Sequence, residues 1–280
     1  MRRSGILAAP FLAGLVLLVV APAIAAIYLA FTQFTAIEPP RFTGLDNLGR
    51  LVDDAAFWRS LGNSAIYVVL AVPLRLVAAV GFALLLHRRS RGVGAARAIA
   101  FLPSVVPEAA YALLWLWLLN PVYGPIPLLL GGAAPDLLTD PWGARIGIAL
   151  MGAFQIGEAF VIALAARRVI PGSLYEAAAV DGASPWWTLR KVTLPLMAPI
   201  IALLALRDVV LSLQVNFVPA LVLTDGGPRY ATTYLPLYVY RTAFRYFRFG
   251  YASMMTLTMF VATACIIFVM YRLARRWRLV

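Results

Sequence analysis

The feature that most constrains this chain is a series of long apolar runs with few or no charged residues. The first and last runs contain no charge at all, and the other four contain one or two each. At about 1.5 Å per helical residue, each run is long enough to cross the roughly 30 Å hydrocarbon core of a bilayer. The sequence therefore predicts an all-α, polytopic membrane protein with six transmembrane helices, at residues 6–31, 61–86, 98–119, 146–166, 196–223 and 249–271.

Composition supports this interpretation and excludes several classes of enzyme. Hydrophobic residues make up 62% of the chain and charged residues only 13%, whereas soluble domains are near 45–50% apolar and about 25% charged. Cys265 and His87 are each the single residue of their type, so neither a disulfide within the chain nor a paired-histidine metal site is expected. The only lysine, Lys191, does not lie in a P-loop motif. We expect no catalytic residue, metal or cofactor in this chain.

Basic residues predict the orientation in the membrane. The termini and the loops expected on the same side carry 14 Lys and Arg residues, against 8 in the alternate loops. Because positively charged loops stay in the cytoplasm, both termini are expected to be cytoplasmic in the plasma (inner) membrane. The apolar run after Arg2 and Arg3 is too long for a cleaved signal peptide and ends without a cleavage site. The pI of 10.4 then indicates attraction to anionic lipid and does not require a nucleic-acid partner.

One cytoplasmic loop, at residues 170–195, has the pattern of two short helices. Ser173 and Glu176 have the spacing of a capping box, which predicts a helix through Val180. Gly182 is placed to end that helix in a left-handed turn, and Ser184 followed by proline predicts the start of a second helix. Helix pairs of this kind suit a rigid docking element, and a solvated linker is the alternative.

At these residues the chain resembles the membrane subunits of binding-protein-dependent ABC importers. Glu176-Ala177-Ala178, then Gly182, then Val192-Thr193-Leu194-Pro195 is similar to the EAA loop of that family, with valine where isoleucine is commoner. The resemblance implies that the loop is a coupling helix that inserts into a cytoplasmic ATPase subunit. The residues expected to make this contact are Glu176, Ala177, Ala178, Asp181, Gly182, Trp186, Leu194 and Pro195.

A second segment is similar to the maltose-type carbohydrate importers, specifically the first of their two permease subunits. It comprises Asn216-Phe217-Val218 and Leu223-Thr224-Asp225-Gly226-Gly227-Pro228. The resemblance covers about residues 8–272. The extra N-terminal spans and the large external domain of the maltose protein have no counterpart in the resemblance, which is to the shorter, six-span version. It implies a type I ABC importer permease fold, divided into a first helix with an external loop (1–60), a permease core (61–272) and a basic cytoplasmic tail (273–280).

The resemblance also implies the partners and the cargo. The chain would pair with a second homologous permease subunit as a heterodimer and bind two cytoplasmic ATPase subunits, which would hold ATP and Mg²⁺. An external solute-binding protein would deliver a sugar or oligosaccharide to the path between the two permease subunits. The chain itself would catalyse no covalent chemistry.

Five ionisable residues fall inside the expected spans, where charges are costly and are usually paired or functional. Arg75 and Glu108 are expected to form structural pairs, and Arg207 to pair with an acid of a neighbouring span. The remaining two, Glu158 and Asp208, are candidates for the substrate path.

The expected substrate-path residues lie in the fourth and fifth spans. Gln155 and Glu158, three residues apart, are expected on one helical face beside an aromatic ring, a combination that suits a polyol. The fifth span has two polar stripes at helical spacing, one of Asp208, Ser212 and Asn216 and the other of Arg207 and Gln214, and the first stripe is the one expected to line the path. Two carboxylates near the path favour neutral or cationic carbohydrate, unless Arg75 or Arg207 faces the cargo. The path residues are Phe154, Gln155, Glu158, Asp208, Ser212 and Asn216.

Three alternatives remain open from the residues. A proton-coupled secondary transporter could use Glu158 or Asp208 as its proton site, but it leaves the EAA loop unexplained and would be favoured by an internal repeat, which is not apparent. An intramembrane enzyme with the same carboxylate pair also leaves the loop unexplained. An ABC permease for a non-sugar solute, such as glycerol phosphate, is the third.

Overall fold

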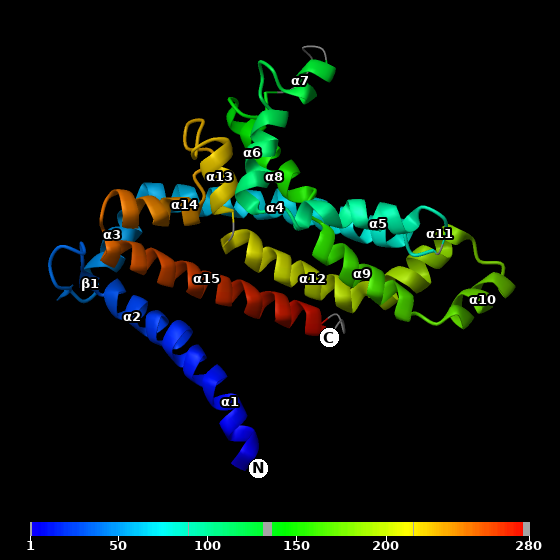
Figure 1. The fold of residues 1–280 in the computed structure, drawn as a ribbon, viewed down its shortest axis with the longest axis horizontal. Coiled ribbons are helices and arrows are strands. Elements are labelled where there is room, and N and C mark those ends of the chain that lie inside the picture. The colour runs from blue at the N-terminus through cyan, green and yellow to red at the C-terminus, as the bar shows by residue number, and fades with distance from the viewer. Residues whose placement is uncertain (1, 89, 131–135, 215, 277–280) are drawn as a thin grey trace. The chain divides into compact units, whose positions relative to one another are not determined.

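The described part of the chain is mostly helical, as its apolar runs predict (Figure 1). The computed structural model describes residues 2–88, 90–130, 136–214 and 216–276, the side chains of 2–8, 274 and 276 excepted. Two compact units emerge: Met1–Arg59 with Leu237–Cys265, and Ser60–Pro236 with Ile266–Val280. The division expected at residues 60 and 272 concerns membrane topology and coupling, so it stays a prediction. Residues 277–280 of the expected basic tail lie outside the described residues.

The first unit begins with a long apolar helix. Its parts are α1 (Arg2–Leu15), the π-helical turn η1 (Val16–Val20) and α2 (Ala21–Ala30). No residue in the most apolar window of Ala9–Ala30 is buried against the protein. A helix that is apolar all round and not covered by protein is suited to contact with lipid.

A small hairpin and short helices complete the first unit. Strands β1 (Thr32–Gln33) and β2 (Arg41–Phe42) pair antiparallel and are followed by α3 (Asp46–Asp53). The Asn47 amide of α3 donates to the carbonyls of Ala30 and Thr32, both at 2.9 Å, and so holds the hairpin against the end of α2. Later in the chain the unit adds most of α14 (Leu235–Tyr240), the π-helical turn η4 (Arg241–Arg245) and the first part of α15 (Phe249–Arg276).

Asp54 joins three helices of the first unit. Its Oδ1 accepts hydrogen bonds from the backbone N–H groups of Ala56 and Phe57, which caps the start of α4 (Ala55–Leu85). Its Oδ2 accepts from the hydroxyls of Tyr238 in α14, at 2.8 Å, and Tyr251 in α15, at 2.6 Å. One carboxylate therefore satisfies an exposed helix start and links it to two distant segments of sequence.

The second unit contains the remaining helices and a core shared by α4, α9 and α12. Its buried apolar residues include Ala79 of α4, Phe160 of α9, and Met197 and Leu204 of α12. The helices added here are α5 (Val93–Phe101), η2 (Leu102–Ser104), α6 (Glu108–Leu118), α7 (Pro125–Leu129), α8 (Pro141–Ala153), α9 (Gly157–Val169), α10 (Gly172–Val180), α11 (Pro185–Thr188), η3 (Leu189–Thr193), α12 (Leu194–Gln214) and α13 (Phe217–Leu223).

Three of the expected spans are each built from two helices and not from one straight helix, so the count of six transmembrane helices stays a prediction. Val93–Ser104 and Glu108–Leu118 meet at 99°, and Pro141–Ala153 and Gly157–Val169 meet at 49°. Within the described residues, four helices are long and apolar enough to cross a membrane, and the number reaches six if each bent pair counts as one span.

The first bend has a local cause in the sequence. Pro107 precedes α6, where its ring and missing N–H prevent a continuous helix. The fifth expected span instead starts earlier and ends earlier, because helix runs through Pro185–Gln214 and α13 is a separate helix after Asn216.

Candidate functional site

Side chains from other segments of the chain bind backbone groups on both sides of the break between α8 and α9. Arg75 of α4 donates through Nε to the carbonyl of Gly152, at 2.9 Å, in the last turn of α8. The hydroxyl of Ser104 accepts from the N–H of Gly157, at 2.9 Å, where α9 begins. Helix ends leave unpaired N–H and C=O groups. The Ser104 bond satisfies the N–H of Gly157, and the Arg75 bond adds to the one that the Gly152 carbonyl already accepts from the N–H of Gln155.

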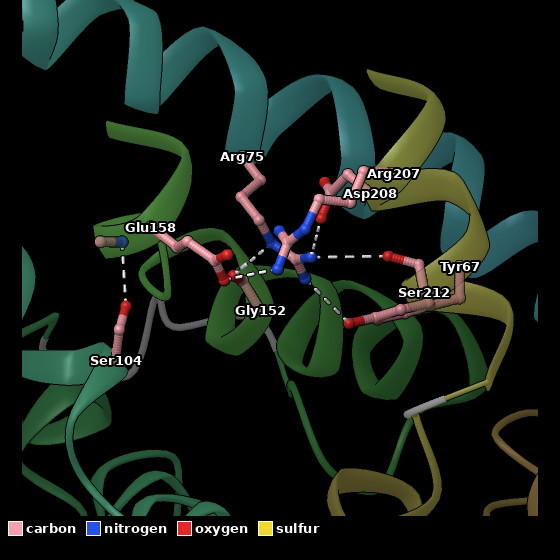
Figure 2. A network of polar contacts seen from close by, with 9 residues as sticks. Tyr67, Arg75, Ser104, Gly152, Glu158, Arg207, Asp208 and Ser212 are labelled. Carbon is pink, nitrogen blue, oxygen red and sulfur yellow. Dashed lines mark hydrogen bonds and ion pairs between the residues drawn. The ribbon is translucent and has the colours of Figure 1, made fainter. Parts of the chain in front are cut away.

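Arg75 is the centre of a buried polar network (Figure 2). Its Nη1 lies 2.5 Å from Oδ1 of Asp208 in α12 and 3.5 Å from the hydroxyl of Ser212, one turn further on. Its Nη2 donates to the hydroxyl of Tyr67, at 3.4 Å. Only 14% of the Arg75 side chain and 8% of that of Asp208 are exposed, so α4 and α12 share a buried ion pair.

A second ion pair links α9 to α12 and is far more open. Arg207 Nη2 lies 2.5 Å from Glu158 Oε2, and the two side chains are 39% and 62% exposed. Arg207 therefore pairs with an acid of a neighbouring helix, which confirms that prediction. Glu158 lies in the first turn of α9, where the positive end of the helix dipole favours an anion.

The two ion pairs border a small polar cavity of about 210 Å³. Charged and amide groups dominate its lining, which offers both donors and acceptors to a hydroxylated ligand. The lining residues are Arg75, Ser104, Gln155, Glu158, Ala159, Arg207, Asp208 and Leu211.

The structure brings only part of the expected path together. Gln155 and Glu158 both line the cavity, but they do not share a helical face, because the helix breaks between them. Asp208 lines the cavity too, and its neighbour in the stripe, Ser212, is bound to Arg75. Phe154 packs against the ring of Trp115 and is not in the cavity lining.

The last residue of the expected stripe, Asn216, is separated from α12. It stands immediately before α13, where it is almost completely buried. Neither polar atom of its side chain has a hydrogen-bond partner within the described part of the chain, and nothing there explains this. Glu108, expected to form a structural pair, lies in the first turn of α6 and makes no ion pair with any described residue.

Sequence reasoning did not identify two residues that shape this site. Tyr67 is uncharged and lies within an apolar run, so no sequence pattern marks it. Its role depends on Arg75, which follows eight residues later in the same helix. Ser104 follows Leu102-Pro103, a proline-marked turn, but nothing in that motif indicates that its hydroxyl caps a helix far along the chain.

The loop at residues 170–195 folds as two helices, with one error in the prediction. The N-cap of α10 is Pro171 and no side chain caps it, so Ser173 and Glu176 do not form the expected capping box. The helix starts earlier because Pro171 already has the extended backbone that precedes a first turn. Ser184 behaves as predicted, since its hydroxyl accepts from the N–H of Trp187 at the start of α11.

Gly182 ends α10 as predicted. Its φ of +73° is left-handed, and its N–H donates to the carbonyl of Ala179 while the next N–H, of Ala183, donates to that of Ala178. This pair of bonds is the Schellman arrangement, which favours glycine at the left-handed position. The turn directs the chain from α10 into α11, and Figure 1 shows both short helices between α9 and α12 along the chain.

The expected coupling residues differ in exposure. Ala178 is buried, and Leu194 is partly buried in the core beside α9. Pro195 lies in the first turn of α12, directly after the π-helical turn η3. The exposed members are Glu176, Ala177, Asp181, Gly182, Trp186 and Pro195.

Residues 71–279 match the model of the family described as "Binding-protein-dependent transport system inner membrane component". The chain belongs to this family. The match confirms the resemblance drawn from the EAA residues, and it makes the chain a membrane component of a transport system located in the inner membrane. The matched segment includes the cavity, the helices α10 and α11 and both ion pairs.

Relatives of known name place the chain among ABC transporter permeases. It is 32% identical to the probable ABC transporter permease protein YesP of Bacillus subtilis, over 96% of this chain and 89% of that protein. It is 31% identical to the lactose transport system permease protein LacF of Rhizobium radiobacter, over 84% of this chain and 82% of that protein.

A solved structure supports the fold. The fold matches a chain of a bacterial ABC transporter involved in the import of the acidic polysaccharide alginate, with a TM-score of 0.86 and 25% identity. The match covers 98% of this chain and 96% of the other. A chain of a bacterial alginate ABC transporter, solved in complex with an alginate pentasaccharide-bound periplasmic protein, has the same fold, with a TM-score of 0.85 and 24% identity. The fold of a binding-protein-dependent ABC importer permease is thus shared along nearly the whole chain.

Proposed function

We propose that this chain is a permease subunit of an ATP-driven importer for a sugar or oligosaccharide, with six membrane spans and cytoplasmic termini. Each bent helix pair then counts as one span, in agreement with the length and apolar character of the pairs. The distribution of Lys and Arg supports this orientation. The chain itself positions cargo and transmits motion, and another subunit binds ATP and Mg²⁺.

The observation that carries the proposal is the geometry of the coupling loop. Helix α10 ends in a left-handed turn at Gly182, and α11 then presents two exposed tryptophans, Trp186 and Trp187. Exposed aromatic residues on a short helix pair with a fixed turn between the helices are typical anchors for a protein partner. This geometry supports docking to a cytoplasmic ATPase. In a transporter that works without an ATPase, the two exposed tryptophans would have no evident role.

The cavity supports the remaining partners. Its polar groups come from one chain, and both members of the Glu158–Arg207 pair remain substantially exposed. A second homologous permease subunit would cover this side and complete the path as a heterodimer. Two ATPase subunits, one for each permease, and an external solute-binding protein complete the importer that we propose.

Sugar is the cargo that the cavity and the relatives favour. Carboxylate, amide and guanidinium groups around a small cavity suit a polyol, and the named relatives include a lactose permease. The argument that carboxylates would repel an acidic sugar does not hold, because Arg75 and Arg207 neutralise Asp208 and Glu158. The proposal therefore includes sugars with an acidic group, such as the alginate carried by the solved importer.

The test is sugar-stimulated ATP hydrolysis by the complex purified through this chain. The protein is compared with Gly182→Asp, with and without the binding protein and with a panel of neutral and acidic sugars. A side chain at a left-handed position costs about 1 kcal/mol, and a new charge lies on the face offered to the ATPase. We expect the stimulated rate to fall at least about tenfold.

Gly172→Asp is the matched control, because Gly172 is also exposed, lies at the other end of α10 and has ordinary φ. An acid in the first turn suits the helix dipole, so this variant should retain stimulation. Absence of a copurifying ATPase in the unaltered protein would overturn the proposal, and uptake driven by a proton gradient alone would favour a secondary transporter.

A further inference from the structure

We propose that Tyr175 is the positioning residue that transmits movement of the coupling helix α10 to both α9 and α12. The proposal rests on the function proposed above, since it needs an ATPase that moves α10. Tyr175 lies in α10 immediately before Glu176, and its side chain is partly buried, unlike the exposed surface of the same helix. It faces the rest of the protein and not the expected ATPase.

Tyr175 makes two contacts, each to a different helix. The guanidinium of Arg167, in the last turn of α9, lies 4.3 Å from the centre of the tyrosine ring. The tyrosine hydroxyl lies 3.1 Å from the hydroxyl of Thr193 in η3. The first contact is a cation–π interaction, and the second is a hydrogen bond to a buried side chain. One side chain therefore attaches α10 both to the end of α9 and to the start of α12.

The hydrogen bond between Tyr175 and Thr193 lies at a π-helical turn, and either hydroxyl can be its donor. The Thr193 hydroxyl also lies 3.5 Å from the carbonyl of Thr188, the residue immediately before that turn. π-Helical turns within longer helices are often found at functional sites, where they alter the direction of the helix that follows. The tyrosine is thus bonded at the point where η3 continues into α12.

Movement at this point would reach the cavity, because α9 and α12 behave as a joined pair. They share a buried apolar core that includes Phe160, Ala163, Met197 and Leu204. At the far end of α9, Glu158 is paired with Arg207 of α12. The helix between Arg167 and Glu158 rises about 1.5 Å per residue, so it is a rod of roughly 14 Å between the coupling loop and the cavity.

The two contacts thus define a connected path. Displacement of α10 is transmitted through Tyr175 to α9 and η3, and the Glu158–Arg207 pair holds the start of α9 against α12. Without the hydroxyl, α10 still docks on the ATPase through its exposed face but transmits less of its displacement to α12. The expected defect is poor coupling of ATP hydrolysis to transport, with assembly preserved.

The experiment measures the amount of sugar imported per ATP hydrolysed by the complete complex in proteoliposomes. Tyr175→Phe removes only the hydroxyl, Thr193→Val removes its partner, and the double variant completes a double-mutant cycle. A hydrogen bond contributes about 0.5–1.5 kcal/mol, which corresponds to about a twofold to tenfold change. We expect each single variant to lower the ratio in that range and the double variant to be no worse than the worse single one.

Arg167→Gln and Arg168→Gln form a matched pair for the ring contact. The two arginines are neighbours in the last turn of α9, and the ring contact is to Arg167. Only Arg167→Gln should lower the ratio, while ATPase copurification stays unchanged in every variant.

Three results would overturn the proposal: an unchanged ratio in Tyr175→Phe, additive losses in the double variant, or equal losses in the two arginine variants. Loss of copurifying ATPase would show that Tyr175 maintains the docking surface and does not transmit movement. Failure of the proposed function is distinct, because sugar would then not stimulate ATP hydrolysis even in the unaltered complex.

Discussion

Asp208 is the residue whose loss should be most damaging to stability, because it neutralises the buried guanidinium of Arg75. In Asp208→Asn, the guanidinium remains buried among Tyr67, Ser212 and the Gly152 carbonyl without its counter-ion. Removing one partner of a buried ion pair typically costs 3–5 kcal/mol. We expect a loss of about 3 kcal/mol, measured as a lower midpoint of thermal unfolding in detergent.

The double variant Arg75→Met/Asp208→Leu provides the control for this prediction. Apolar replacement of both partners avoids the unpaired buried charge and should restore much of the lost stability. Equal or greater destabilisation in the double variant would contradict the argument and would indicate that the bonds from Arg75 to α8 matter more than its charge balance.

Asp54 should make stability depend on pH in the acidic range. Burial acts to raise the pKa of Asp54, but the hydrogen bonds from Tyr251, Tyr238 and the backbone N–H groups of Phe57 and Ala56 outweigh it, so the pKa is lowered. A lowered pKa stabilises the fold fully above the ordinary value of about 3.9, and this contribution is lost as pH falls through the lower value. Solvent screening limits the contribution to about 1 kcal/mol or less.

Comparison with Asp54→Asn isolates this effect. As the pH falls from about 6 to about 3, the free energy of unfolding should decrease more in the unaltered protein than in the variant. Thermal unfolding at each pH measures this difference. Parallel curves for the two proteins would show that Asp54 contributes no pH dependence.

At the residue scale, the sequence indicated which charged groups need a partner. It was less informative about which residue that partner is. Charges inside apolar runs are costly, so the pairing of Arg207 with an acid of another helix could be expected. The pairing of Arg75 with Asp208 depends on how α4 packs against α12, which no spacing within one helix reveals. Asp54 lies outside the apolar runs, and its two tyrosine partners are more than 180 residues away.

At the element scale, the two serines of the coupling loop give a direct test of which one caps a helix. Ser184 accepts from the N–H of Trp187, whereas Ser173 lies inside α10 and caps nothing. Loss of an N-cap costs about 1 kcal/mol, or roughly fivefold in local opening. Hydrogen exchange in the peptide containing Trp187 should therefore accelerate in Ser184→Ala and remain unchanged in Ser173→Ala. Equal exchange in both variants would contradict the assignment of the cap.

The same scale shows why helix breaks were missed while helix content was predicted well. Apolar runs and proline or glycine signals identify helices from local sequence. The break before Gly157 instead depends on Ser104, which satisfies the freed N–H of Gly157, and on Arg75, which binds the carbonyl of Gly152 from elsewhere in the chain. An apolar run without proline therefore gave no reason to expect two helices at residues 146–166.

At the scale of the whole molecule, the proposed topology can be tested because the chain has one cysteine. In a Cys265→Ser background, a new cysteine replaces either Val122, in the loop between α6 and α7, or Val180, at the end of α10. Both side chains are highly exposed, so access to reagent and not burial should decide their reaction. Six spans with cytoplasmic termini place Val122 outside and Val180 inside.

A membrane-impermeant maleimide added to intact spheroplasts should label Val122→Cys and not Val180→Cys, and permeabilised cells should show both. The full reversal of this pattern would invert the orientation, place the coupling helix outside and remove the basis for an ATPase partner. Labelling of both positions in sealed spheroplasts would instead contradict the count of six spans, because an even number of crossings must lie between two loops on one face. Orientation and coupling therefore depend on each other: α10 can serve an ATP-driven importer only if it lies on the cytoplasmic side of the membrane.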